Sequence, residues 1–78
     1  MLHVSAIKYI KDYYLWLSFN DGTSGNINLY NHLKGRMFEP LKNKVLFSQV
    51  FLDKELETIV WPNGADFAPE FLRDNLES

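Results

Sequence analysis

The sequence contains no cysteine, which excludes a disulfide, a zinc–thiolate site and a cysteine nucleophile. No apolar run approaches the roughly 20 residues that a membrane-spanning helix needs. Residues 1–4 lack the basic and then apolar layout of a secretory leader, so we expect no signal peptide. These absences favour a reducing, cytoplasmic compartment and no contact with a membrane, and we expect a prokaryotic source.

Motifs that carry chemistry are also missing. There is no Gly-x-Ser-x-Gly nucleophile elbow, and residues 22–25 are too short for a phosphate-binding loop and lack its lysine. The two histidines, His3 and His32, are 29 positions apart and have no paired metal-ligand spacing around them. We therefore expect a protein that is not an enzyme and that binds no cofactor and no metal.

The composition is that of a globular chain. Hydrophobic residues make up 46% of the 78 positions and aromatic residues 15%, which favours one folded domain over residues 1–78. The charge is uneven, because residues 1–52 hold six basic and three acidic side chains, whereas residues 53–78 hold two and seven. Such asymmetry can steer a partner, although exposed acidic faces of the last elements also explain it.

Three strands are predicted in the first third of the chain, at residues 2–11, 13–19 and 23–29. Alternation breaks near residues 6–7, which indicates a bulge or twist in the first strand. The second strand carries apolar groups on both faces, which predicts a central strand covered on both sides. Asn20-Asp21-Gly22 is a strong hairpin signal. Gly25 indicates a bulge or a close backbone approach in the third strand.

Residues 30–44 are expected to be irregular with short helical turns, including one at residues 40–43 that begins at Pro40. Four apolar side chains of this segment should plug one end of the core: Leu33, Met37, Phe38 and Leu41. Residues 47–52 and 58–61 are predicted to form a hairpin of two strands. The last helix should begin at Pro69 and bury Phe71, Leu72 and Leu76.

These elements predict an α+β fold. A small antiparallel sheet of about five strands should consist of a three-strand meander, an irregular segment with a short helix, and a hairpin. A C-terminal helix is expected to close the sheet.

Three pieces of sequence resemble one known family. They are residues 19–22 (Phe-Asn-Asp-Gly), a central Phe38-x-x-Leu41 followed by Phe47, and above all residues 58–72, with the run Trp-Pro-Asn-Gly-Ala-Asp-Phe-Ala-Pro-Glu. The family is the small prokaryotic one labelled domain of unknown function 2442, and the resemblance covers nearly the whole chain. It implies a compact α+β domain, found alone or joined to a helix-turn-helix module. It supplies no catalytic residue.

The resemblance also implies a partner. Members are often encoded beside another small uncharacterised protein, in an arrangement that suggests paired partners of toxin–antitoxin type. The chain ends at Ser78, which leaves no room for the helix-turn-helix module, so we do not expect this chain to read DNA directly.

Within the closing motif, two interpretations compete. Asp66 and Glu70 could act as a catalytic carboxylate pair of a hydrolase-type enzyme. Of the functions considered, we favour this one least. In the structural interpretation, Asp66 accepts backbone N–H groups and Glu70 complements the helix dipole. The whole motif then forms a strand-to-helix corner: Trp61, Pro62, Asn63, Gly64, Asp66, Pro69 and Glu70. Trp61 should be its buried anchor.

Two surfaces could bind a macromolecule. A basic segment at residues 34–44 could contact phosphates through Lys34, Arg36, Lys42 and Lys44, which supports an alternative function as a nucleic-acid-associated regulatory protein. Tyr14 and Trp16, which share one face of the second strand, could instead contribute to an aromatic surface that contacts a protein. We favour a small non-enzymatic interaction module that binds a partner protein through this aromatic surface or a sheet edge, and we expect that the edge could also support a homodimer.

Overall fold

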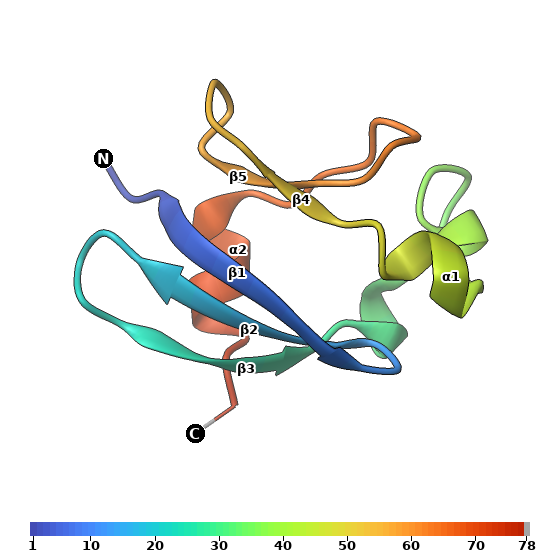
Figure 1. Cartoon of the computed structure of the whole chain (residues 1–78), viewed down its shortest axis with the longest axis horizontal. Coiled ribbons are helices and arrows are strands. Elements are labelled where there is room, and N and C mark those ends of the chain that lie inside the picture. The colour runs from blue at the N-terminus through green and yellow to red at the C-terminus, as the bar shows by residue number, and fades with distance from the viewer. Residues whose placement is uncertain (78) are drawn as a thin grey trace.

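The computed structural model describes residues 1–77 as two small antiparallel sheets with short helices (Figure 1). The first sheet has the order β1-β2-β3 and the second pairs β4 with β5. In sequence order, the elements are β1 (Val4–Lys11), β2 (Tyr14–Phe19), β3 (Ser24–Asn28), the 3₁₀ turns η1 (Tyr30–His32) and η2 (Glu39–Lys42), α1 (Lys44–Phe47), β4 (Phe51–Asp53), β5 (Thr58–Val60) and α2 (Pro69–Asp74). The α+β class is therefore confirmed, but the predicted single sheet of about five strands is divided in two.

The three-strand meander forms as its turn chemistry predicts. Gly22 has φ +88°, and its N–H bonds the carbonyl of Phe19 at 3.1 Å, so the Asp-Gly turn uses the backbone freedom of glycine. The pairing of β1 with β2 shifts register between Val4 and Ala6, which places the predicted irregularity about one residue earlier than expected. Gly25 stays in register with Leu17, so it marks a close approach of the C-terminal segment and not a bulge.

The prediction of a strand at residues 47–52 was wrong over most of its length. Asn43 caps α1 by accepting a hydrogen bond from the N–H of Leu46 at 3.1 Å. This cap starts a helical turn that ends at Phe47, so β4 begins only at Phe51. An apolar run of this length does not distinguish a buried helical turn from a strand.

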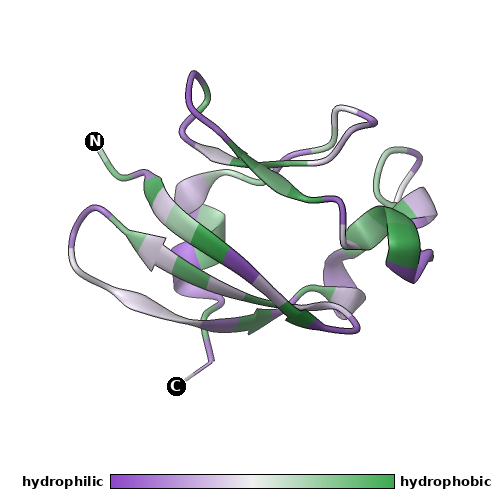
Figure 2. Ribbon diagram, viewed as in Figure 1, coloured by the Kyte–Doolittle hydropathy of each residue, from purple (hydrophilic) through white to green (hydrophobic). Residues whose placement is uncertain are grey.

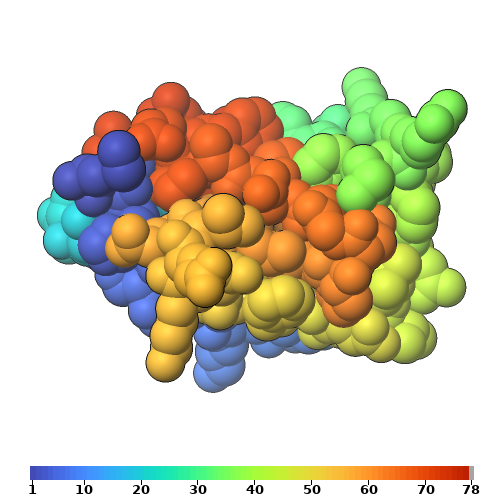
Figure 3. Space-filling view, turned by 90° about the horizontal axis from the view of Figure 1, so that it is seen from above, coloured from blue at the N-terminus to red at the C-terminus, as the bar shows by residue number. Residues whose placement is uncertain are grey.

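The core lies between the two sheets and α2. Leu15, Leu17 and Ile27 of the meander are fully buried, as are Ile59 of β5 and Leu72 of α2. In Figure 1, α2 lies behind the three-stranded sheet, and Figure 3 shows the β4–β5 hairpin beside β1. Figure 2 shows hydrophilic residues at the β2–β3 turn and at the tip of the β4–β5 hairpin. The irregular segment plugs the core with Leu33 and Leu41, but Met37 is 44% exposed, contrary to the prediction.

Residues 61–72 form the expected strand-to-helix corner. The N–H of Trp61 bonds the carbonyl of Ala65 at 2.9 Å, and the N–H of Gly64 bonds the carbonyl of Trp61 at 2.8 Å. Gly64 has φ +91°, which explains a glycine at this turn. Pro69 occupies the first turn of α2 as predicted, because its missing N–H has no intrahelical partner there.

A polar contact joins the β2–β3 turn to α2. The carboxylate of Asp21 accepts hydrogen bonds from the Thr23 hydroxyl at 2.6 Å, the Thr23 N–H at 3.0 Å and the Arg73 guanidinium at 2.8 Å. These donors, with Thr23 first, lower the pKa of Asp21 from 3.8 to about 2. The contact therefore depends on the ionised carboxylate.

We expect this carboxylate to contribute to stability at neutral pH and to lose that contribution in acid. Because its folded pKa lies below the ordinary value, the stabilisation is present above about pH 3.8 and disappears as the pH falls towards 2. Carboxyl-carbon NMR should show Asp21 titrating near pH 2, with Thr23→Val raising that pKa more than Arg73→Gln does. Titration near 3.8 in the unaltered chain would contradict the contact.

Candidate functional site

The outward surface of the three-stranded sheet is the best candidate for a binding site. We define this open face by the side chains of Lys8, Ile10, Tyr14, Trp16, Asn26 and Asn28. Tyr14 and Trp16 on β2 are half-buried, and the other four side chains are exposed. The prediction that both sides of β2 are covered was therefore wrong, because only the side that carries Leu15, Leu17 and Phe19 faces the core.

The two tryptophans have opposite environments. Trp61 has no exposed surface, and its indole N–H donates to the carbonyl of Phe47 at 2.9 Å. Trp16 keeps part of its ring exposed, and its indole N–H makes no hydrogen bond within residues 1–77. An indole that is partly exposed and has a free donor suits a contact with another molecule.

Trp16 stands in the middle of a row that crosses all three strands. Lys8 of β1 and Asn26 of β3 are its direct antiparallel neighbours. With Tyr9 and Ile10, these residues line a shallow hollow of about 540 Å³, which we call the Trp16 hollow. Lys8, Ile10 and Asn26 were not among the predicted site residues. The Asp-Gly turn signal could have found Asn26, because the turn sets the register of β2 against β3.

A second hollow of about 310 Å³ adjoins Tyr14. Its lining residues are Asp12, Tyr13, Tyr14, Asn28, Tyr30 and Lys44. The rings of Tyr13 and Tyr30 are tilted with centroids 5.0 Å apart, and the Tyr13 hydroxyl bonds the carbonyl of Lys42. Lys44 reaches this hollow but pairs with Asp12 at 3.0 Å, and that hydrogen bond raises the pKa of Lys44.

The structure divides the predicted basic segment. Lys42 pairs with Glu39 at 2.9 Å, which raises the pKa of Lys42, and Lys44 is held by Asp12. Lys34 and Arg36 are exposed and form no ion pair within the described residues. Two of the four predicted phosphate contacts are thus already neutralised by carboxylates of the same chain, which weakens this segment as a phosphate-binding surface.

The closing motif is organised by Asn63 and not by Asp66. Asn63 accepts a hydrogen bond from the Ala65 N–H at 3.1 Å and donates to the Met37 carbonyl at 2.9 Å. The side chains of Asp66 and Glu70 are exposed and make no hydrogen bond or ion pair in the described part of the chain. The prediction that the Asp66 side chain accepts backbone N–H groups was wrong, since α2 has no side-chain cap and Asp66 contributes only a backbone bridge to Val60.

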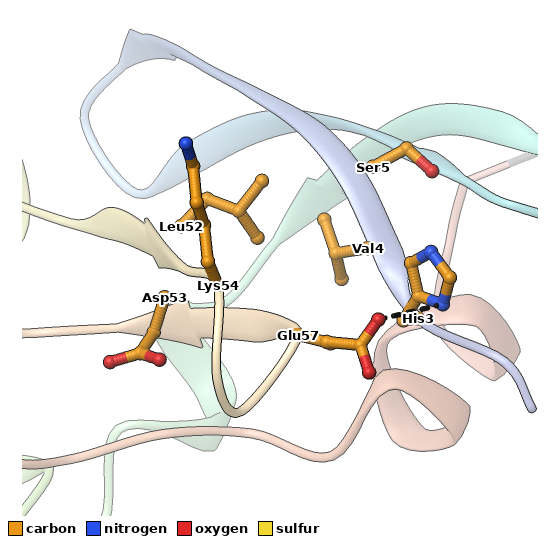
Figure 4. A pocket seen from close by; sticks show the side chains of 7 residues that line it. All are labelled: His3, Val4, Ser5, Leu52, Asp53, Lys54 and Glu57. Atoms are coloured by element: carbon orange, nitrogen blue, oxygen red, sulfur yellow. Dashed lines mark ion pairs between the residues drawn. The ribbon is translucent and has the colours of Figure 1, made fainter.

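The histidines lie in separate places. His3 pairs with Glu57 at 3.2 Å beside a groove of about 330 Å³ between β1 and the β4–β5 hairpin (Figure 4). Figure 4 shows Ser5 on β1 near this pair, and no hydrogen bond joins Ser5 to His3. His32 packs edge-on against Phe71 with centroids 5.0 Å apart. Among residues 1–77, no three His, Asp or Glu side chains are grouped so that they could hold a metal ion.

The free sheet edge at β3 is partly occupied by the chain itself. The N–H of Glu77 donates to the carbonyl of Asn26 at 2.8 Å, and a Cβ atom at Gly25 would lie 3.6 Å from Leu76. The C-terminal segment therefore runs along the edge that a second copy would pair with. The open face, by contrast, has no such cover in the described residues.

Comparison with known proteins gives one result. A family model with the description "Protein of unknown function (DUF2442)" matches residues 4–78. No curated protein and no solved structure matches the chain. In the described part of the chain, no helix has the length and apolar character to cross a lipid bilayer.

Proposed function

The chain belongs to the DUF2442 family, and from this starting point we propose that it is a non-enzymatic module that binds a partner protein through the open face. The observation that carries the proposal is the state of Trp16. A large aromatic ring remains partly exposed at the centre of a sheet, and its indole N–H has no hydrogen-bond partner among residues 1–77, while Trp61 already anchors the core. Exposed aromatic side chains of this kind are enriched at the centres of protein interfaces.

The biological setting that we propose is a paired system. The partner would be the small protein encoded beside this one, in a toxin–antitoxin-like or regulatory pair in the prokaryotic cytoplasm. The charge distribution supports a directed encounter, because the acidic residues concentrate after residue 52 while β1, β2 and β3 contain no Asp or Glu. A homodimer through the β3 edge is a weaker proposal, since residue 77 already bonds that edge.

Replacing Trp16 by alanine tests the proposal. When the protein is co-expressed with the neighbouring gene product, the complex should be recovered with the unaltered chain. Trp16→Ala should weaken it by about 2 kcal/mol or more, roughly a 30-fold loss of affinity for a central aromatic contact. Isothermal titration with the purified partner measures the change, and light scattering gives the stoichiometry.

The matched control is Phe51→Ala. Phe51 is a large aromatic side chain with 43% exposure on β4, outside the open face, so its truncation should leave the affinity nearly unchanged. Equal losses for both variants, or no complex with a chain that stays monomeric, would contradict binding through the open face.

The nucleic-acid alternative has its own test. If residues 34–44 bind RNA or DNA, the affinity should fall steeply with salt concentration and should depend on Lys34 and Arg36, the two cations of this segment that form no ion pair within residues 1–77. The pairing of Lys42 and Lys44 with carboxylates leads us to favour the protein partner.

A further inference from the structure

The charged side chains on and beside the open face are Lys8, which belongs to it, and Lys11, which lies next to Tyr14 at its margin. Within β1, β2 and β3 there is no Asp or Glu, and the only cations are Lys8 and Lys11. Both are exposed. In the β1–β2 register, Lys11 lies directly opposite Tyr14 and Lys8 directly opposite Trp16, so both lysines project on the side of the aromatic rings. Neither forms an ion pair within residues 1–77, unlike Lys42 and Lys44.

The Trp16 hollow combines three kinds of chemistry in one cross-strand row. Directly opposed residues in an antiparallel sheet have Cβ atoms about 4.5–5.5 Å apart, so Lys8, Trp16 and Asn26 form a continuous strip of cation, ring and amide. Ile10, which is 43% exposed, adds an apolar wall. A ligand that fills this hollow needs an apolar group for Ile10 and Trp16 and a negative group within reach of Lys8.

We propose that the partner covers the open face with an acidic and apolar segment, in which a large aliphatic side chain enters the Trp16 hollow and an adjacent carboxylate pairs with Lys8. This inference rests on the proposed function and specifies the partner's chemistry. The charge supports it, because Lys8 on the open face and Lys11 beside it form no ion pair within residues 1–77, and β1, β2 and β3 carry no Asp or Glu that would repel a carboxylate. Asn26 can bond a backbone or side-chain amide of the same segment.

A protein segment fits this face better than a single-stranded nucleic acid. Aromatic rings on a sheet can stack bases, but nucleic-acid binding also draws on several phosphate contacts. Lys8 on the open face and Lys11 beside it are the two lysines of the three strands, neither forms an ion pair within residues 1–77, and the nearby Lys44 is held by Asp12 at 3.0 Å. Seven carboxylates follow residue 52, which gives that part of the chain a charge that repels phosphates.

The two tryptophans supply an internal readout for a peptide titration. Nitrogen–proton NMR should show two indole N–H signals, one from Trp16 and one from the buried Trp61. The probe is a capped hexapeptide of alternating glutamate and leucine. Matched peptides replace glutamate by lysine, or leucine by serine. We expect the glutamate–leucine peptide to shift the Trp16 signal and leave that of Trp61 in place, while both matched peptides bind more weakly.

Charge reversal tests the lysine. Lys8→Glu should lower the affinity for the glutamate–leucine peptide by roughly five- to tenfold and raise the affinity for the lysine–leucine peptide. Lys54→Glu is the matched control, because Lys54 is an exposed lysine of the β4–β5 hairpin and does not line the Trp16 hollow. This control should change neither affinity beyond about twofold.

Three outcomes would overturn the inference. One is equal binding of the acidic and basic peptides, and another is an equal response to Lys8→Glu and Lys54→Glu. The third is a salt-sensitive Trp16 shift with an oligouridine of about eight nucleotides and none with the peptides. The proposed function is tested separately: a co-expressed complex that depends on Trp16, with no response to acidic peptides, overturns only the inference about the partner's chemistry.

Discussion

Trp61→Ala is expected to lower the free energy of unfolding by about 3–5 kcal/mol, the range for truncation of a buried aromatic side chain. The indole has no exposed surface, and its ring lies 5.6 Å from that of Phe47 and 5.9 Å from that of Phe67 by centroid distance. Truncation also leaves the Phe47 carbonyl without its 2.9 Å hydrogen bond. Because a domain of this size should be stable by only about 5 kcal/mol, the lower end of the usual range, the variant should barely fold.

Urea denaturation followed by circular dichroism measures this change, and two variants separate its causes. Trp61→Phe keeps most of the ring but removes the hydrogen bond, so it should cost less than Trp61→Ala. Trp16→Ala removes the same atoms from a half-buried position, so it should lower the free energy of unfolding clearly less than Trp61→Ala does. A Trp61→Ala protein with a near-native melting temperature would show that the indole is not part of the core.

Phe47→Ala should be the second severe change and should also lower the free energy of unfolding by about 3–5 kcal/mol. Phe47 is fully buried, and its ring contacts those of Tyr9, Tyr13 and Trp61 with centroids 6.1, 5.3 and 5.6 Å apart. One residue of a single-turn helix therefore connects the meander to the corner after β5. Guanidinium denaturation of the variant and the unaltered chain gives the difference.

The control for Phe47 lies in the same helical turn. Val45 is 70% exposed, so Val45→Ala should change stability by less than about 0.5 kcal/mol. A large loss of stability for Val45→Ala, with little effect of Phe47→Ala, would show that the opposite side of α1 faces the core. The Phe47 and Trp61 losses should not add in the double variant, because the two rings contact each other.

The meander could be predicted closely because its signals are local. Asp-Gly between alternating runs specifies a hairpin, and the burial of Leu15, Leu17 and Ile27 follows from period-two alternation. Pro69 marked the start of α2 for an equally local reason, since proline removes only an N–H without an intrahelical partner.

The hairpin and the motif were predicted less well because their signals depend on distant partners. Phe47 sits in a helical turn because Asn43 caps it and because the rings of β1, the β1–β2 turn and the β5 corner surround it. Asn63, and not Asp66, orders the corner because it reaches the Met37 carbonyl, 26 positions away. Neither contact can be read from spacing along the chain.

The candidate site was likewise predictable only where its signals are local. Tyr14 and Trp16 were assigned to one face of β2 from alternation alone, but alternation does not say whether that face is covered. Only the packed structure leaves this face open and places Lys8 and Asn26 on either side of Trp16.

By itself, the sequence determined the α+β class, the family, the meander and the buried position of Trp61, because turn residues and alternating apolar side chains act over a few positions. The tertiary structure alone decided the division into two sheets, the helical state of Phe47, the neutralisation of Lys42 and Lys44, and the exposure of Trp16. Each of these depends on which distant surfaces meet, and in a chain of this size the core is large enough to cover only one face of the central strand.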